Sequence, residues 1–135
     1  MTDQSWWMTA LKAASATVLA AVVALFGGWS QILTILCVLM AADYGTGLAA
    51  AFRTCTVSSR VGTVGLLKKA VILLVIMVAA QVDRLTGGDT FRDCAALFYI
   101  ANEGLSILEN LGRLGVPIPK ALARVFAALK EEQDS

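Results

Sequence analysis

Six polar or charged residues recur at helical spacing within one segment of the C-terminal half of the chain. They are Asn102, Glu103, Ser106, Glu109, Asn110 and Arg113, separated by steps of 1, 3, 3, 1 and 3 residues. On a helix of about 3.6 residues per turn, these steps place all six on one face. Carboxylates, amides and a guanidinium on one face can line an aqueous path or a polar interface between copies of the chain. The alternative is a surface helix whose polar side is solvated at lipid headgroups.

No arrangement of nucleophiles or metal ligands accompanies this polar stripe. The chain has no histidine, which excludes Ser-His and Cys-His nucleophilic devices. Cys37, Cys55 and Cys94 form no C-x-x-C pair, so a zinc site is not expected and the three thiols are interpreted as small packing residues. Residues 62–69 have the wrong spacing for a phosphate-binding loop. We therefore predict that the protein is not an enzyme, has no catalytic residues and uses no metal or cofactor.

The elements that position the stripe are unusually apolar. Of the 135 residues, 58% are hydrophobic and 16% are charged, whereas a soluble domain is about half apolar and about a quarter charged. A chain this short cannot bury so much apolar surface, so the excess must face lipid or other copies. The net charge of +1 gives no reason to expect a nucleic-acid partner.

The apolar segments predict an all-α fold, a single small integral membrane domain made of helices. The hydrophobic helices are expected at 9–27, 30–52, 66–82 and 91–111, followed by an amphipathic helix at 118–132. Each hydrophobic segment approaches the ~20 residues that a helix needs to cross a bilayer. The Gly27-Gly28 turn predicts a tight antiparallel hairpin of the first two helices. A cleaved signal peptide is the competing interpretation of the first segment.

Basic residues predict the orientation in the membrane. The loop between the second and third helices holds Arg53, Arg60, Lys68 and Lys69 and no acid, which places it in the cytoplasm. The C-terminal region from Arg113 is also basic, so four crossings with both termini cytoplasmic satisfy the pattern. The three-crossing alternative leaves the first or the fourth hydrophobic helix in the interface. The amphipathic tail either lies on an anionic membrane surface or packs on the protein itself.

Asp43 lies near the middle of the second hydrophobic segment. A central Asp costs on the order of 3 kcal/mol on insertion scales, so we expect it to face another helix or water. It is either a polar contact that holds the bundle together or part of a water path. Gly45, Gly47 and Gly104 offer small-residue surfaces for close helix packing.

Residues 98–119 read FYIANEGLSILENLGRLGVPIP, with the polar stripe in the middle. This segment resembles the C-terminal signature of the phage lysis holins of the Cp-1-like and toxin-secretion group. Three earlier pieces also match this group: 43–47 (DYGTG), 58–62 (SSRVG) and 65–69 (GLLKK). The resemblance covers roughly residues 30 to 120.

The resemblance implies a bacteriophage protein of the bacterial cytoplasmic (inner) membrane that forms homo-oligomers in the bilayer. At a set time such proteins form lesions that release an endolysin, their functional partner, while relatives outside phages export toxins. The six stripe residues and Asp43 are then predicted to line the lesion or the oligomer interface. The alternatives are a small channel or transporter and a non-conducting scaffold, and the sequence does not separate a holin from an antiholin.

Overall fold

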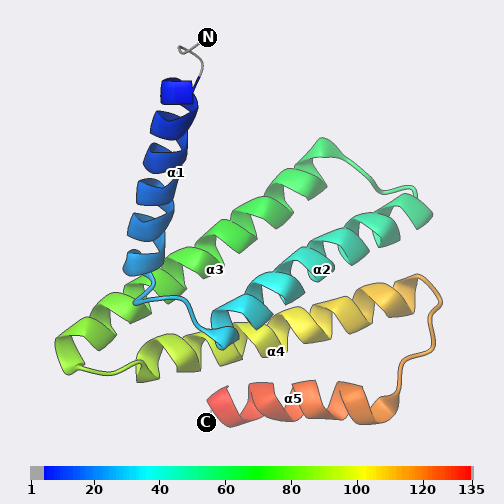
Figure 1. Cartoon of the computed structure of the whole chain (residues 1–135). Coiled ribbons are helices and arrows are strands. Elements are labelled where there is room, and N and C mark those ends of the chain that lie inside the picture. The colour runs from blue at the N-terminus through cyan, green and yellow to red at the C-terminus, as the bar shows by residue number, and fades with distance from the viewer. Residues whose placement is uncertain (1–4, 135) are drawn as a thin grey trace.

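A computed structural model describes residues 5–134, which form α-helices and no strand within that range (Figure 1). The helices are α1 (Ser5–Leu25), α2 (Gln31–Arg53), α3 (Ser59–Thr86), α4 (Thr90–Arg113) and α5 (Lys120–Asp134). The predicted all-α fold class is confirmed. By length and composition, α1, α2 and α3 are apolar enough to cross a membrane, while α4, which carries the polar stripe, falls outside this group.

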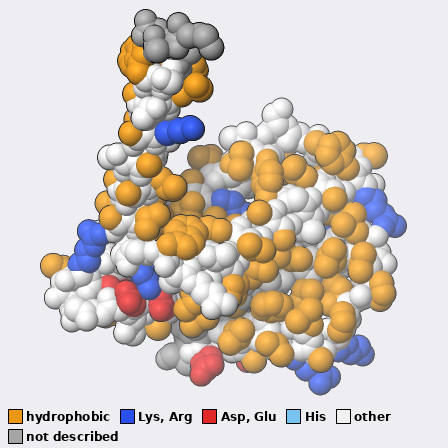
Figure 2. Space-filling view, in the orientation of Figure 1, with side chains coloured by type: hydrophobic (Ala, Val, Ile, Leu, Met, Phe, Trp, Pro, Cys, Tyr) orange, Lys and Arg blue, Asp and Glu red, His pale blue; other side chains and the backbone are white. Residues whose placement is uncertain are grey.

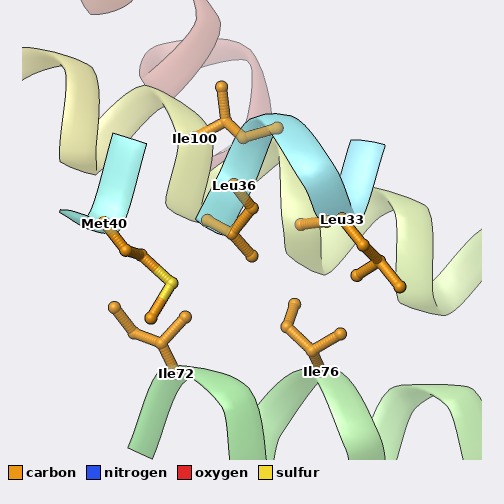
Figure 3. Close-up of a cluster of buried hydrophobic side chains, with 7 residues drawn as sticks. Leu33, Leu36, Met40, Ile72, Ile76 and Ile100 are labelled. Carbon is orange, nitrogen blue, oxygen red and sulfur yellow. The ribbon is translucent and has the colours of Figure 1, made fainter. Parts of the chain in front are cut away.

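The central element is α4, which packs against α2, α3 and α5 (Figure 1). A small apolar core lies where α2, α3 and α4 meet. Residues spaced three, four or seven apart share one face of a helix, and each helix contributes such a set. Figure 3 shows Leu36 and Met40 of α2 directed toward Ile72 and Ile76 of α3, and Ile100 of α4 belongs to the same cluster. The core consists of Leu33, Leu36, Met40, Ile72, Ile76, Ala96 and Ile100.

The outer surface of this bundle is apolar. Hydrophobic side chains cover most of the face in Figure 2, and charged side chains gather mainly toward its edges. On α3, Val71, Leu74 and Val78 are each more than half exposed. Extended apolar surface of this kind marks a contact with lipid or another protein, which fits the membrane assignment.

Serine caps set the starts of α2 and α3. The hydroxyl of Ser58 accepts a hydrogen bond from the Val61 amide at 3.2 Å, and Ser30 caps α2 through the Leu33 amide. Helix α3 therefore begins at Ser59, one to two turns before the apolar segment expected at residue 66. It ends at Gly87, whose φ of +82° is the left-handed geometry that glycine adopts at a helix C-terminus.

The predicted hairpin of the first two helices is wrong. Helix α1 contacts α3 rather than α2, and it points away from the other four helices (Figure 1). No side chain of α1 is buried. Gly27 and Gly28 both have positive φ, +71° and +91°, and they turn the chain so that α1 and α2 diverge.

Side chains of α3 and α4 hold the C-terminal end of α1. The last carbonyls of a helix lack partners within the helix, and here four consecutive carbonyls receive external donors. Arg92 Nη1 donates to the carbonyls of Phe26 at 3.2 Å and Gly27 at 3.1 Å. The carbonyls of Ala24 and Leu25 are acceptors for Arg84 and Gln81. Because these bonds come from the bundle, they fix the direction of α1 relative to it.

Arg92→Met is expected to loosen this attachment. The substitution removes the two hydrogen bonds to the end of α1, together with the ion pairs of Arg92 with Asp89 and Asp93. Arg92 is only 4% exposed, and a charged hydrogen bond contributes about 1.5–3 kcal/mol. Spin labels at positions 9 and 66, in a cysteine-free background, should report a broader distance distribution. Lys12→Met, on the exposed face of α1, should leave it unchanged. An equally narrow distribution in the Arg92 variant would contradict the anchoring role.

Asp83 connects α3 to the start of α4. Its carboxylate, 3% exposed, accepts from the amide of Phe91 at 2.9 Å and from the amide of Arg92 at 2.8 Å. The first amides of a helix need such acceptors. A residue expected at the start of a loop thus belongs to α3 and caps α4.

Helix α5 packs on α4. Of the two alternatives for the amphipathic tail, the structure therefore shows the one in which it packs on the protein itself. The ring of Phe126 lies over Gly104. A β-carbon at position 104 would come within 2.5 Å of the ring, so only glycine permits this approach. Leu122 and Val125 remain exposed on the outer side of α5.

Candidate functional site

A cavity of about 880 Å³ lies between α2, α3 and α4. Its walls are the C-terminal half of α2, the N-terminal half of α3 and the C-terminal half of α4. These three halves meet at one end of the bundle because α3 runs in the opposite direction to α2 and α4 (Figure 1). The connection between α2 and α3 contributes Thr54 and Thr56 to the lining at that end.

Three charged side chains, one from each helix, meet in the wall of the cavity. The ammonium group of Lys69 on α3 donates to a carboxylate oxygen of Asp43 on α2 at 2.5 Å and also to a carboxylate oxygen of Glu103 on α4. The side chains of Lys69, Asp43 and Glu103 are 14%, 15% and 8% exposed. We call these three residues the charged triad. It joins helices that are distant in sequence.

Asn110 extends the triad along α4. Its amide nitrogen donates to a carboxylate oxygen of Asp43 at 3.2 Å and to the hydroxyl of Thr46 at 3.2 Å. Thr46 in turn donates to the Ala42 carbonyl at 2.8 Å. Among the described side chains, no buried polar atom lacks a partner. The polar atoms at the centre of the bundle are therefore satisfied internally.

The triad contains two carboxylates and one ammonium, so it carries a net charge of −1 when all three groups are ionised. In a medium of low dielectric constant, removing one partner of such a set leaves an uncompensated charge that is expensive to bury. Asp43 faces α3 and α4, the placement that the cost of an Asp in lipid predicts. The network supplies what charges at membrane depth require, which is a partner for each.

The polar stripe of α4 is divided between the cavity and the surface. Five of its six members line the cavity, and the sixth, Glu109, is exposed outside it. The structure does not pair Glu109 with Arg113, although these residues are four apart on α4. The cavity-lining members are Asn102, Glu103, Ser106, Asn110 and Arg113. The role of all six in a lesion or an interface stays a prediction.

The three glycines predicted to pack helices occupy different surroundings. Gly47 lies 3.5 Å, measured from a β-carbon built on it, from the amide nitrogen of Asn110, and Gly104 lies under Phe126. Gly45 is exposed, with open space where its β-carbon would be. A packing role for Gly45 therefore requires another copy of the chain.

Lys69 is the site residue that sequence reasoning missed. The sequence analysis counted Lys68 and Lys69 among the basic residues of the loop that precedes the third hydrophobic helix. Because α3 begins ten residues earlier, at Ser59, Lys69 lies inside the helix and reaches the carboxylates. The sequence could have indicated this role, because Asp43 and Glu103 both lie in apolar segments and two buried acids need a basic residue nearby.

Possible metal ligands do not cluster in the part of the chain that the structure describes. No group of three or more Cys, Asp or Glu side chains there is arranged to hold a metal ion. The arrangement instead combines paired charges, hydrogen-bonding groups and a cavity at one end of a membrane-type bundle. Such a site can hold polar groups apart from lipid or expose them to water.

Comparisons with known proteins identify the family. The family model of the bacteriophage holin family matches residues 20–131. An uncharacterized protein of Halalkalibacterium halodurans is 42% identical over 133 residues, covering 93% of this chain and 98% of its own length. A protein of Bacillus phage phi105 described as a probable holin is 36% identical over 110 residues, covering 79% of this chain and 80% of its own length. No solved structure matches the chain.

The match spans α2, α3, α4, the charged triad and most of α5. It thus includes every helix that builds the cavity, and the resemblance seen in residues 98–119 agrees with it. The chain belongs to the bacteriophage holin family.

Proposed function

We propose that this chain oligomerises in the bacterial cytoplasmic membrane and forms lesions that release an endolysin for host lysis. The observation that carries the proposal is the charged triad with Asn110, buried between three helices and bordering a cavity. A protein that only anchors itself in lipid has no use for these costly groups. A protein that must later expose these helices to water does need such groups.

The described structure fits the early state of such a protein. Lys69 neutralises one of the two carboxylates, and Asn110 binds the other polar atoms of Asp43. The charges of the bundle interior are hidden from lipid, so single copies can accumulate in a bilayer without damaging it. Five of the six stripe residues lie on the inner side of α4 in this state.

The late state would follow from association of copies at high density. Helix α1 has no buried residue and Gly45 faces open space, so both are available to a neighbouring copy. Contacts between copies would compete with those between α2, α3 and α4 within one copy. Once the triad opens, water can solvate Asp43, Lys69 and Glu103, and the stripe would line an aqueous lesion.

Four crossings with both termini in the cytoplasm remain the proposed topology. Helix α4 has 24 residues, which at ~1.5 Å per residue give about 36 Å, enough to cross the hydrocarbon core. Its composition alone does not suggest a span. Its polar side, however, is turned toward α2 and α3, so the cost of crossing is lower than the sequence implies.

The test is lysis by a Glu103→Leu/Glu109→Leu variant, produced inducibly in a bacterium together with an endolysin. Membrane potential and release of the endolysin are followed together. We expect lysis to be abolished or shifted in time, because both carboxylates of the stripe are gone. Lys120→Gln, an exposed change at the start of α5, should lyse on schedule.

Three results would contradict the proposal. One is unchanged lysis by the double variant at equal accumulation in the membrane. Another is loss of membrane potential by the native chain without passage of the folded endolysin, since that behaviour belongs to a small selective channel. The third is normal potential and no release at any level, which would indicate a scaffold or an antiholin.

A further inference from the structure

Two basic side chains of the cavity have no partner among the described residues. Five charged residues line the cavity: Asp43, Glu103, Lys68, Lys69 and Arg113. Both acids share Lys69, and Lys68 and Arg113 are the two bases of the lining that make no ion pair among the described residues. Three bases against two acids give the lining a net charge of +1. An occupant of this cavity should therefore carry negative charge.

One wall of the cavity is apolar and open to the outside. Val64, Leu67 and Val71 of α3 line it at steps of three and four residues, so they form one face of the helix. Their exposed fractions are 43%, 59% and 56%. Because α3 is apolar enough to cross a membrane, this wall is expected to lie against acyl chains. An occupant should therefore be apolar along part of its length.

We propose that the cavity binds one anionic phospholipid. The phosphate is held between Lys68 and Arg113, and an acyl chain lies along the Val64, Leu67 and Val71 face. Asn102 and Ser106 also line the cavity and supply hydrogen-bond donors for the glycerol or phosphate oxygens. The volume of about 880 Å³ lies within the ~300–1,000 Å³ typical of small-molecule sites.

The position of the cavity along the helices supports a headgroup at this depth. Glu103 and Arg113 are ten residues apart on α4, which corresponds to about 15 Å at ~1.5 Å per residue. The cavity thus extends from the charged triad to the end of the bundle, where Arg53 and Arg60 also lie. Under the positive-inside rule this end faces the cytoplasmic leaflet, and basic pockets between membrane helices on that side bind anionic headgroups.

A helix of a second copy fits the cavity less well. The helix with no buried residue is α1, and its only charged residue within Ser5–Leu25 is Lys12. Inserting α1 would bring a third cation toward Lys68 and Arg113. An anionic lipid would neutralise these two groups instead.

The experiment measures lipids retained by the purified full-length chain in detergent, using native mass spectrometry. The probes are dioleoyl phosphatidylglycerol and dioleoyl phosphatidylcholine. The Lys68→Gln/Arg113→Gln variant is compared with Arg60→Gln/Lys120→Gln, which removes two exposed charges that do not line the cavity. Helix content by circular dichroism confirms that both variants are folded.

We expect the native chain and the control variant to retain one phosphatidylglycerol in preference to phosphatidylcholine. The cavity variant should bind phosphatidylglycerol about 30-fold more weakly, because each basic residue near an anionic surface contributes about 1 kcal/mol and 1.4 kcal/mol is tenfold. Inorganic phosphate should not displace the lipid, since it lacks the acyl chain. Equal weakening in both variants, no preference for phosphatidylglycerol, or displacement by phosphate would overturn the proposal. The readout needs no lesion, so it can fail or succeed independently of lysis.

Discussion

Lys69→Met is expected to lower the free energy of unfolding by about 3 kcal/mol. Removing one partner of a buried ion pair costs about 3–5 kcal/mol, and the lower end applies because Lys69 and Asp43 keep 14% and 15% exposure. The substitution keeps the aliphatic stem of the side chain and removes only the ammonium group. Asp43 and Glu103 would then face each other with no base between them.

An exposed lysine of α1 provides the control. Lys12 lies outside the cavity and makes no ion pair among the described residues, so Lys12→Met should change the stability by less than about 0.5 kcal/mol. The measurement is unfolding of the detergent-solubilised chain by increasing amounts of SDS, followed by circular dichroism. Adding Asp43→Asn and Glu103→Gln to the Lys69 variant should recover most of the loss, because no charge is then left unpaired. Equal midpoints for the two lysine variants would show that the triad does not stabilise the bundle.

Gly104→Leu is expected to detach α5 from α4. Even a β-carbon at this position would lie 2.5–2.8 Å from three atoms of the Phe126 ring, and a leucine would occupy the space of the ring itself. Overpacking of this kind costs about 1–3 kcal/mol. Because α4 is the partner of α5 in the fold, the amides of residues 120–134 should exchange about 10-fold to 100-fold faster with solvent.

Hydrogen exchange of the α5 amides, followed by mass spectrometry, tests this expectation. Gly45→Leu is the matched control, since a side chain there meets open space. It should leave the exchange of α5 unchanged. A Gly104→Leu/Phe126→Ala variant should slow the exchange again, because the smaller residue at 126 makes room for the leucine. If Gly104→Leu exchanges like the native chain, the close contact of the two helices is not what holds α5.

Periodicity and composition predicted much of this molecule. The steps between Asn102 and Arg113 place polar groups on one face of a helix, and α4 has that face. The cost of Asp43 in lipid requires a neighbour, and its carboxylate has two: the ammonium of Lys69 and the amide nitrogen of Asn110. These features depend on helical spacing and on the cost of placing a charge in lipid, and both can be evaluated from a single sequence.

Other features depend on how the helices meet, and the sequence does not state this. Nothing in the sequence distinguishes Lys69 from Lys68, yet the rotation of α3 directs one into the triad and leaves the other exposed. From the sequence, Asp83 follows the expected helix 66–82 and Arg92 lies in the first turn of the expected helix 91–111, and neither residue has an evident partner. Both are buried because of contacts made in the folded chain. The carboxylate of Asp83 accepts hydrogen bonds from amides at the start of α4, and the guanidinium of Arg92 donates to carbonyls at the end of α1.

Helix α1 has no buried residue and contacts only α3 among the helices. The last turn of α1, through the carbonyls of Ala24 and Leu25, and the turn that follows it accept hydrogen bonds from the rest of the molecule. These bonds end on main-chain atoms, and the side chain that packs on the core there is Phe26, just beyond the helix. Any apolar helix joined to the same Phe26 and glycine turn would present the same carbonyls and keep the same core contact. The N-terminal helix is therefore an exchangeable part, and its replacement by an unrelated apolar helix should leave the folding of α2 to α5 intact.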